Sequence, residues 1–354
     1  MQTMSTVEIA DITVGDGSTF VIAEAGSNHN NDLSKAKELI DVAADAGVDA
    51  VKFQTFRAET MYPEESGAAD YLDTDESLYD LVSEMEMPYH WIPKLQKHCV
   101  ERDVIFLSTP TDRRAVDELA DYVPAFKIAS FTMSHHLFLE YVAQQGKPVI
   151  LSTGAHSMSE VRESVEALQS AGIDDIVLLQ CTSSYPAPLE SANIRVIERF
   201  AHEFDLPSGL SDHTLDPITA PTAAVAVGGD VIEKHFTLDK SLDGPDHSFA
   251  IEPDELTEMV SAIKRTENVL GMDEKEVQSV EEEMHDIARR RIHAATNISA
   301  GEKLSDENIK VLRSGKNENG LVPKFYHEVL GMRTEESVSA GQGITWDLIR
   351  TDDL

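Results

Sequence analysis

Residues 19–270 alternate between short apolar stretches and longer stretches in which apolar residues recur every three or four positions. The short stretches, rich in β-branched residues, predict buried strands, and the three-to-four spacing predicts amphipathic helices. Eight strands are predicted, at residues 20–25, 50–53, 104–107, 125–129, 149–151, 176–179, 207–210 and 231–232. Eight alternations of strand and helix over this length predict an α/β fold of the parallel (β/α)8 TIM-barrel type.

An open doubly wound sheet is the alternative fold, because it also alternates strands with helices. Such sheets usually carry a glycine-rich G-x-G-x-x-G turn after the first strand. Residues 24–29 occupy that position and read Glu-Ala-Gly-Ser-Asn-His, which does not match the motif. The pattern therefore favours the closed barrel.

One acidic segment, residues 57–88, interrupts the alternation and contains Tyr62, Tyr71 and Tyr79. It is too long for an ordinary connection between a strand and a helix. Long loops at the C-terminal face of a barrel usually shape or cover a site. We therefore expect this segment to form a lid.

The pattern changes again near residue 273. Residues 273–287 are mostly charged with almost no apolar periodicity, and we expect them to be a linker after a barrel domain of residues 1–272. Residues 288–354 contain glycines between short β-like stretches, which we place at 292–295, 309–312 and 343–346. These residues predict a small β-rich domain near the lower size limit for an independently stable core.

The composition is strongly acidic, with 64 Asp and Glu against 29 Lys and Arg and a formal net charge of -35. This excess argues against a nucleic-acid partner or an anionic membrane surface, since both require positive contacts. Charge spread over the whole chain repels itself in dilute buffer and is screened by salt. We expect a halophilic protein, with an unusually acidic mesophilic one as the alternative.

The localisation expected from the sequence is cytoplasmic. No apolar stretch approaches the roughly 18 residues that a membrane span needs, and the N-terminus lacks the pattern of a secretory signal. The two cysteines, Cys99 and Cys181, are too few for a disulfide framework. A reducing compartment is therefore expected.

Polar or ionisable side chains lie in or directly after every predicted strand. Barrel enzymes carry their catalytic groups at the C-terminal ends of the strands. A single buried lysine or histidine is more often structural than functional. Many such groups at one face would leave a costly unpaired cluster unless a polar ligand binds there. The candidate residues are Glu24, Lys52, Gln54, Thr109, Lys127, Ser130, Ser152, Thr153, Ser183, Tyr185, Ser211, His213, Glu233 and His235.

Three chemical roles follow for these side chains. Lys52 and Lys127, with neighbouring hydroxyls, can form a cage for a phosphate or carboxylate. His213 and His235 follow adjacent strands and could share one divalent metal ion, for which manganese, zinc or cobalt is suited. Two structural histidines would have the same spacing. The remaining pair, Glu24 and Glu233, are the candidate carboxylates for proton transfer.

Eight ordered motifs resemble the sialic acid (N-acetylneuraminate) synthase family, which includes legionaminate and pseudaminate synthases. They are IAEAGSNHN (22–30), VKFQ (51–54), KIAS (127–130), LSTG (151–154), CTSSYP (181–186), GLSDHT (209–214), IEKHFT (232–237) and GPDH (244–247). The C-terminal region resembles the antifreeze-like (SAF) domain of these enzymes. The resemblance covers almost the whole chain and implies a barrel joined to that domain in a domain-swapped homodimer.

The resemblance also implies a reaction. It implies that phosphoenolpyruvate condenses with an open-chain N-acetylated amino sugar and water to give a nine-carbon 2-keto acid and phosphate, with cleavage of the C–O bond. It implies a metal on His213 and His235, for which we expect Mn2+, with Mg2+ or Co2+ as alternatives. It assigns the donor to Lys52, Lys127, Ser130, Ser152 and Ser183, and the sugar to Gln54, Tyr185, Asp246 and Arg290.

The acceptor sugar stays open, as do two other functions. Ser183 stands where neuraminate enzymes typically have asparagine, and residues 127–131 are closer to the pseudaminate and spore-coat branches, whereas residues 244–247 are closer to the neuraminate and legionaminate branches. An aldolase that forms a Schiff base on Lys52 or Lys127 is one alternative. A carbohydrate-binding protein without turnover is the other.

Overall fold

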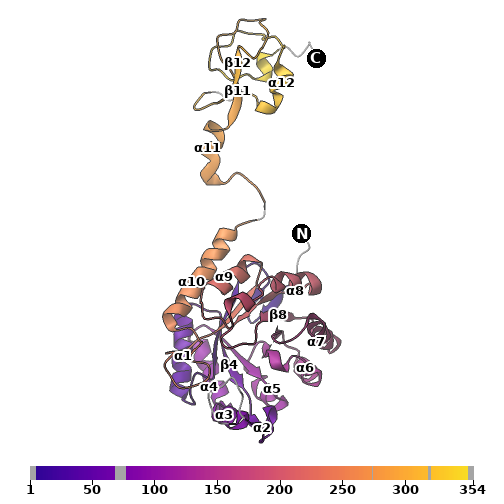
Figure 1. The fold of residues 1–354 in the computed structure, drawn as a ribbon, viewed down its shortest axis with the longest axis vertical. Helices are drawn as coiled ribbons and strands as arrows, with labels where there is room; N and C mark the ends of the chain where they lie inside the picture. The colour runs from indigo at the N-terminus through magenta and orange to yellow at the C-terminus, as the bar shows by residue number, and fades with distance from the viewer. Residues whose placement is uncertain (1–4, 68–76, 273, 318–319, 350–354) are drawn as a thin grey trace. The chain divides into compact units, whose positions relative to one another are not determined.

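A computed structural model describes residues 5–67, 77–272, 274–317 and 320–349. The chain divides into two compact units, Met1–Gly271 and Met272–Leu354 (Figure 1). Each unit has its own hydrophobic core.

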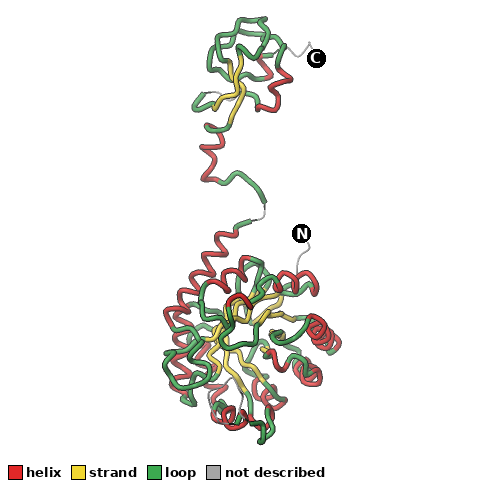
Figure 2. Tube along the Cα trace, in the orientation of Figure 1, coloured by secondary structure: helices red, strands yellow, loops and turns green. Residues whose placement is uncertain are grey.

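The first unit is built on eight parallel strands surrounded by helices (Figures 1 and 2). The hydrogen-bonded order is β5-β4-β3-β10-β9-β8-β7-β6, and the two end strands, β5 and β6, also pack against each other. The nearly closed (β/α)8 barrel is therefore confirmed, rather than the doubly wound sheet. The strands are β3 (Phe20–Gly26), β4 (Ala50–Thr55), β5 (Ile105–Pro110), β6 (Phe126–Ile128), β7 (Val149–Ser152), β8 (Ile176–Cys181), β9 (Ser208–Asp212) and β10 (Val231–His235).

An N-terminal hairpin closes one end of this barrel. Strands β1 (Val7–Ile9) and β2 (Ile12–Val14) pair antiparallel. Their apolar side chains pack with the first residues of the barrel strands, such as Phe20 and Val231, in one buried cluster. Because apolar side chains fill the N-terminal end, the C-terminal end of the strands is left for a site.

Helices cover the outer face of the barrel because each has one apolar side. In α1 (Leu33–Ala46), for example, Leu39, Ile40 and Ala43 are buried and the helix ends at Gly47, whose φ of 81° is the left-handed conformation that glycine adopts readily. The other long connecting helices are α4 (Ile92–Glu101), α5 (Arg113–Leu119), α6 (His136–Ala143), α7 (Met158–Ser170), α8 (Val196–Phe204), α9 (Thr219–Ala226) and α10 (Pro253–Leu270). Short 3-10 turns are η1 (Tyr89–Trp91), η2 (Ser130–Thr132) and η3 (Leu189–Ser191).

The segment predicted to be a lid, residues 57–88, contains two short helices, α2 (Ala58–Met61) and α3 (Leu78–Glu84). These helices contact each other and share a small apolar cluster around Phe56 and Val82. Part of the predicted lid, residues 68–76 with Tyr71, lies outside the described residues.

The second unit begins with η4 (Ser279–Glu281) and α11 (Glu282–Ile287), which occupy the predicted linker and whose side chains are exposed or half-buried. Its sheet pairs β11 (Arg290–Ala294) with β12 (Ile309–Arg313), close to two of the predicted strands. The strand predicted at 343–346 is wrong, because Gly343 makes an isolated bridge and Trp346 begins a 3-10 turn. The remaining elements are η5 (Pro323–Phe325), α12 (Tyr326–Val329) and η6 (Trp346–Leu348).

Candidate active site

A polar cavity lies at the C-terminal ends of the barrel strands, with a volume of about 60 Å3. Parallel strands bring their carboxyl ends to one face, and alternate residues of each strand point to the interior. Twelve of the residues predicted from the strand ends line this cavity, together with Ala129 and Cys181. The twelve are Glu24, Lys52, Gln54, Thr109, Lys127, Ser130, Ser152, Tyr185, Ser211, His213, Glu233 and His235.

Two lysines and two glutamates form a buried charge network in the cavity. Each of the four residues is at most 3% exposed. Lys52 Nζ lies 2.7 Å from Glu24 Oε2 and 3.8 Å from Glu233 Oε1, and Lys127 Nζ lies 3.2 Å from Glu233 Oε1. The network is close to neutral when all four groups are charged, which offsets part of the cost of burying them.

The two glutamates differ in their tendency to ionise. Burial, with the nearby charge of Glu233, raises the pKa of Glu24 despite the ammonium group of Lys52. Burial also acts against the charged form of Glu233, but the ammonium groups of Lys127 and Lys52 lower its pKa overall. Carboxylates whose environments separate their pKa values can divide the roles of acid and base.

The two lysines also differ. Burial disfavours the charged form of Lys52, but Glu233 and Glu24 raise its pKa above the ordinary value. Burial and the neighbouring Lys52 lower the pKa of Lys127, and Glu233 opposes this effect only in part. Of the two residues considered for a Schiff base, Lys127 has the environment that favours a neutral amine.

Hydroxyl groups from three motifs gather around Gly154. The Ser130 hydroxyl accepts a hydrogen bond from the Gly154 N–H at 3.0 Å. A Cβ atom at Gly154 would lie 2.3 Å from Ser183 Oγ and 3.0 Å from Ser130 Oγ, so any larger residue here would force these side chains to shift. Among the described residues, nothing forms a hydrogen bond with the buried Oγ atoms of Ser152 and Ser183. Such unsatisfied groups are ready to bind a polar ligand.

The imidazole rings of His213 and His235 lie at one side of the same cavity, with their centroids 5.4 Å apart. His213 Nδ1 donates a hydrogen bond to the Thr182 carbonyl oxygen at 2.9 Å, which leaves its Nε2 lone pair available for a metal ion. His235 Nδ1 is buried and lacks a hydrogen-bond partner within the described part of the chain, and the nearest carboxylate oxygen, of Asp246, is 3.6 Å away. Burial and surrounding positive charges lower the pKa of His235 well below its usual value, so its metal-binding neutral form is favoured.

In their neutral forms these two histidines fit an ion held by two protein ligands. Burial lowers the pKa of His213, but contacts with Cys181 and the Thr182 carbonyl oxygen raise it overall, so metal binding there competes with a proton. The described residues contain no group of three or more His, Cys, Asp or Glu side chains arranged for a metal ion. The other coordination positions would therefore belong to water or substrate oxygens. The Tyr185 ring packs against the pair, 4.3 Å from His213 and 6.3 Å from His235 between ring centroids.

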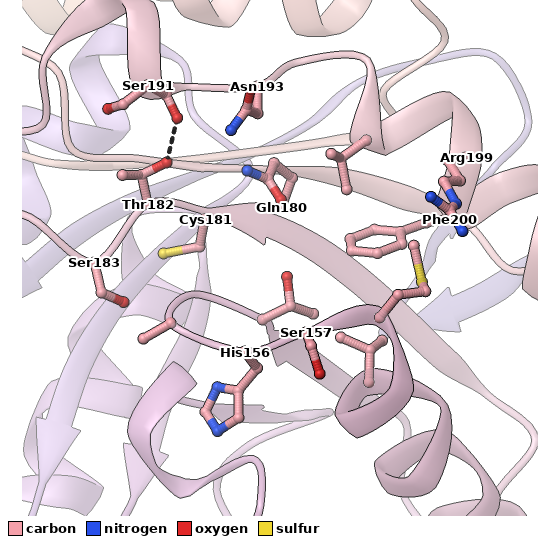
Figure 3. Close-up of a pocket in the computed structure, with 15 residues that line it drawn as sticks. His156, Ser157, Gln180, Cys181, Thr182, Ser183, Ser191, Asn193, Arg199 and Phe200 are labelled. Carbon is pink, nitrogen blue, oxygen red and sulfur yellow. Dashed lines mark hydrogen bonds between the residues drawn. The ribbon is translucent and has the colours of Figure 1, made fainter.

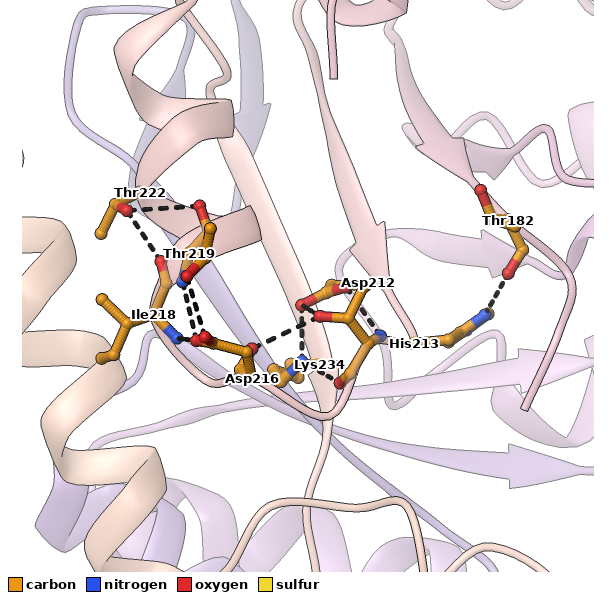
Figure 4. A network of polar contacts seen from close by, with 9 residues as sticks. Thr182, Asp212, His213, Asp216, Ile218, Thr219, Thr222 and Lys234 are labelled. Atoms are coloured by element: carbon orange, nitrogen blue, oxygen red, sulfur yellow. Dashed lines mark hydrogen bonds and ion pairs between the residues drawn. The ribbon is translucent and has the colours of Figure 1, made fainter. Parts of the chain in front are cut away.

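A second, outward-facing ion pair supports the loop that carries His213 (Figure 4). Lys234 Nζ lies 2.5 Å from Asp212 Oδ2 and donates a hydrogen bond to the Thr214 carbonyl oxygen at 2.6 Å. Asp212 also accepts hydrogen bonds from the Thr214 N–H and hydroxyl group. Both charged residues point away from the cavity because each alternates with residues that line it. They are structural residues whose role the motifs GLSDHT and IEKHFT alone did not reveal.

Four predicted residues do not line this cavity. Thr153 and Ser183 line a neighbouring cavity, and the Thr153 hydroxyl donates to the Leu179 carbonyl oxygen. Asp246 lines a third cavity but reaches His235 as described above, and burial raises its pKa to about 6. Arg290 belongs to the second unit, where its guanidinium group donates to the Val311 carbonyl oxygen. Cys181 also lines the cavity and is absent from the predicted residues, although its position at the end of β8 gives the same signal as that of its neighbours.

Comparisons with known proteins identify the family. Residues 39–275 match the NeuB family and residues 289–350 match the SAF domain, and the chain belongs to the NeuB family. It is 42% identical to the spore coat polysaccharide biosynthesis protein SpsE of Bacillus subtilis, covering 99% of both chains. It is 37% identical to the N,N'-diacetyllegionaminic acid synthase of Legionella pneumophila, covering 93% of this chain and 94% of that one.

A solved structure supports the same relationship. The N-acetylneuraminic acid synthetase of Leptospira borgpetersenii is 33% identical, with a TM-score of 0.73, covering 80% of this chain and 95% of that one. The likeness therefore extends over most of this chain. No helix among the described residues is long and apolar enough to cross a membrane.

Proposed function

We propose that this protein is a nonulosonic acid synthase that condenses phosphoenolpyruvate with an open-chain N-acetylated amino sugar, releasing phosphate. The observation that carries the proposal is one buried cavity in which Lys52 and Lys127 lie beside the pair His213 and His235. A donor with carboxylate and phosphate groups needs the first pair, and a carbonyl acceptor needs the second. Relatives named legionaminic acid synthase and N-acetylneuraminic acid synthetase support this assignment.

Binding of the donor is assigned to the lysines and the hydroxyl groups. In the free protein, Lys52 and Lys127 are paired with Glu24 and Glu233. An anionic donor adds negative charge to this network, which favours the charged lysines and proton uptake by the carboxylate whose pKa is already raised, Glu24. The unsatisfied hydroxyl groups of Ser152 and Ser183, with Ser130, would then donate hydrogen bonds to the donor oxygens.

The acceptor is assigned to the side of the cavity that contains the histidines. His213 and His235 would hold a divalent metal ion, for which we propose Mn2+, with Mg2+ or Co2+ as alternatives, and the bound ion would polarise the aldehyde carbonyl group of the sugar. Gln54 and Tyr185 line the same cavity, and Asp246 reaches its edge at His235. These side chains offer the amide, hydroxyl and carboxylate groups that bind sugar hydroxyls.

The proton transfers are assigned to the two glutamates. Carbon 3 of the donor attacks the aldehyde carbon, and Glu24 in its protonated form supplies the proton that turns the aldehyde oxygen into a hydroxyl group. Positive charge then develops at carbon 2 of the donor. Water adds there as Glu233, the more readily ionised carboxylate, accepts its proton. The tetrahedral intermediate then releases phosphate by breaking the C–O bond. The proton of its new hydroxyl group passes to the departing phosphate, which leaves the 2-keto acid.

The proposed working state is a cytoplasmic homodimer in which the second unit of one copy serves the site of the other. Arg290 is the residue of that unit assigned to the N-acetyl group of the sugar. Sedimentation measures the oligomeric state, and mixing an Arg290→Ala chain with a His235→Ala chain tests the exchange. Recovery of activity in the mixture requires that the two copies share sites.

The experiment that tests the function is phosphate release from phosphoenolpyruvate, measured with a panel of N-acetylated hexoses that includes N-acetylmannosamine and a 6-deoxy diacetamido hexose. We expect release that depends on both the acceptor and a divalent metal. Phosphate release at the same rate without an acceptor sugar, or no phosphate release with any sugar of the panel, contradicts the proposal. The panel also shows which of these N-acetylated sugars the protein uses as its acceptor.

A Schiff-base aldolase is the second candidate, favoured by the lowered pKa of Lys127. Borohydride treatment with pyruvate would then attach a stable adduct to the chain, which mass spectrometry detects. The synthase proposal predicts that no adduct forms. Binding of the sugar without any turnover would instead support the non-catalytic carbohydrate-binding alternative.

A further inference from the structure

Two cavities larger than the candidate active site adjoin it. One, of about 810 Å3, shares Cys181 with the active site (Figure 3). The other, of about 400 Å3, is lined by residues of the loop after β3 and of the loop between β10 and α10, including Asp246. Because Asp246 Oδ2 lies 3.6 Å from His235 Nδ1, this second cavity adjoins the side of the active site that is assigned to the sugar.

The loop between β10 and α10, residues 238–250, is closed at its base by backbone hydrogen bonds. The Thr237 N–H donates to the Ile251 carbonyl oxygen, and the Ile251 N–H donates to the His235 carbonyl oxygen. Asp246 lies within the loop, beyond these bonds. Its carboxylate keeps one position beside His235 only if the loop itself is held in place.

The side chain of His247 holds this loop against two other segments. His247 and Thr237 are both 0% exposed. His247 Nδ1 lies 2.6 Å from Thr237 Oγ1, at the end of β10, and its Nε2 lies 3.0 Å from Asn30 Oδ1, in the loop after β3. The Asn30 amide group also donates to the Asp243 carbonyl oxygen at 2.9 Å. Asn30 therefore binds the loop at two points, one of which is the buried ring.

The hydrogen bonds define which atoms of the ring donate and accept. The nitrogen of the Asn30 amide donates to Asp243, so its oxygen faces His247 and accepts from the Nε2–H group. Burial lowers the pKa of His247, which favours the neutral ring and leaves Nδ1 as an acceptor. Thr237 Oγ1 is 2.6 Å from Nδ1 and 3.2 Å from the Asp239 carbonyl oxygen, so its proton goes to the nearer acceptor.

Gly244 allows the loop to close over the ring. Its φ is 145°, a conformation that residues with a side chain rarely adopt. A Cβ atom at this position would lie 2.7 Å from His247 Cδ2 and 3.5 Å from Asn30 Oδ1. The backbone is therefore packed directly on the ring. Because Asp246 immediately precedes His247, fixing the ring also fixes the backbone from which the Asp246 carboxylate projects.

We propose that His247 is a positioning residue for the acceptor sugar, which fastens the loop of residues 238–250 to Asn30 and Thr237 and so holds the Asp246 carboxylate beside His235. His247 is not among the described residues that line the active site or the cavity next to Asp246. It therefore acts through Asp246 and does not touch the sugar. The inference rests on the proposed function, in which Asp246 binds the sugar.

Steady-state phosphate release, with N-acetylmannosamine and the 6-deoxy diacetamido hexose as probes, tests the effect on the sugar. His247→Leu removes both ring nitrogens. We expect it to raise the KM of the sugar at least about fivefold and to change kcat and the KM of phosphoenolpyruvate less than about twofold, because only sugar binding is lost. His247→Gln keeps an N–H that can reach Asn30 and should recover part of the affinity. A lower kcat with an unchanged sugar KM would indicate a merely structural residue and overturns the proposal.

A second background tests whether His247 acts through Asp246. Asp246→Asn alone should raise the KM of the sugar, and adding His247→Leu should raise it further by less than about twofold. An equal effect of His247→Leu in both backgrounds contradicts the proposal. The matched control is His98→Leu, which removes a histidine of α4 that is hydrogen-bonded to Asp41 and should leave both KM values unchanged.

Hydrogen exchange of the full chain without substrates measures the loop itself. Two of its amides form hydrogen bonds within the loop, since Leu242 donates to the Asp239 carbonyl oxygen and Ala250 to that of Asp246. In His247→Leu we expect these amides to exchange at least about tenfold faster, while the amides of β3 and β10 exchange as in the wild type. Unchanged exchange in the loop overturns the proposal even if the wild type releases phosphate. If the wild type releases no phosphate with any sugar, faster exchange still supports the anchoring of the loop, and only the proposed function fails.

Discussion

Replacing Lys234 with methionine should strongly destabilise the barrel. Lys234 is 1% exposed and Asp212 is 2% exposed, so the substitution leaves a buried carboxylate without its cation. It also removes the hydrogen bond to the Thr214 carbonyl oxygen. Methionine can fill much of the space of the lysine stem, so the effect comes from charge and hydrogen bonding more than from a void.

The size of the effect follows from this geometry. Removing one partner of a buried ion pair costs about 3–5 kcal/mol of the free energy of unfolding. Adding Asp212→Asn removes the stranded charge and keeps an oxygen that accepts from the Thr214 N–H. The double variant then lacks mainly the hydrogen bond that the Lys234 ammonium group donates to the Thr214 carbonyl oxygen, at a cost of about 1–3 kcal/mol. The double variant should therefore be more stable than Lys234→Met alone.

Urea unfolding followed by tryptophan fluorescence measures these differences. Trp91 lies in the barrel unit and Trp346 in the second unit, so a Trp346→Phe background reports on the barrel alone. Lys94→Met, at an exposed position of α4, is the control and should change the free energy of unfolding by less than about 0.5 kcal/mol. A Lys234→Met loss below about 1 kcal/mol, or a double variant no more stable than the single one, would refute the reasoning.

Four further predictions concern the site, its packing and the charge of the chain. His235→Ala should abolish metal-dependent phosphate release, because a single histidine binds weakly a metal ion whose other coordination positions belong to water and substrate; an undiminished rate disproves the metal assignment. Gly154→Ala should cost about 1–3 kcal/mol, and Ser183→Ala should recover part of it by removing the nearest clashing atom, as urea unfolding of both variants would show. Burial lowers the pKa of His29 to about 4. The unfolded chain therefore takes up a proton first as pH falls, so stability should decrease by about 3 kcal/mol between pH 6.5 and 4, and His29→Gln should flatten that slope. Unfolding in 0.1 M and 2 M KCl should show a higher free energy of unfolding at high salt if the net charge of -35 is an adaptation to salt; no change favours an acidic mesophilic protein.

The barrel and the set of residues at its mouth could be predicted because both depend on local patterns. Apolar runs followed by polar groups mark the ends of parallel strands, and those ends meet at one face whatever the details of packing. Glu24, Lys52, Lys127 and Glu233 therefore lie in one cavity, as expected. Their pairing could not be predicted, since it depends on strand register and on the irregularity between Glu24 and Gly26 in the pairing of β3 with β4.

Other features depend on contacts between distant residues. Lys234 sits between Glu233 and His235 in one motif, but its side chain faces the opposite side of the strand and pairs with Asp212. The hairpin of β1 and β2 was missed because two three-residue strands give too short an alternation to recognise. The stretch at 343–346 has the composition of a strand, but Gly343 bridges only His293 among the described residues, and the chain then turns.

The fate of the bridging oxygen of phosphoenolpyruvate tests the central claim most directly. With 18O placed between carbon 2 and phosphorus, the isotope shift in the 31P spectrum shows whether the released phosphate keeps that oxygen. The assignment predicts labelled phosphate, released only when an N-acetylated amino sugar and a divalent metal are both present. Unlabelled phosphate, or labelled phosphate released at the same rate without the sugar, would contradict it.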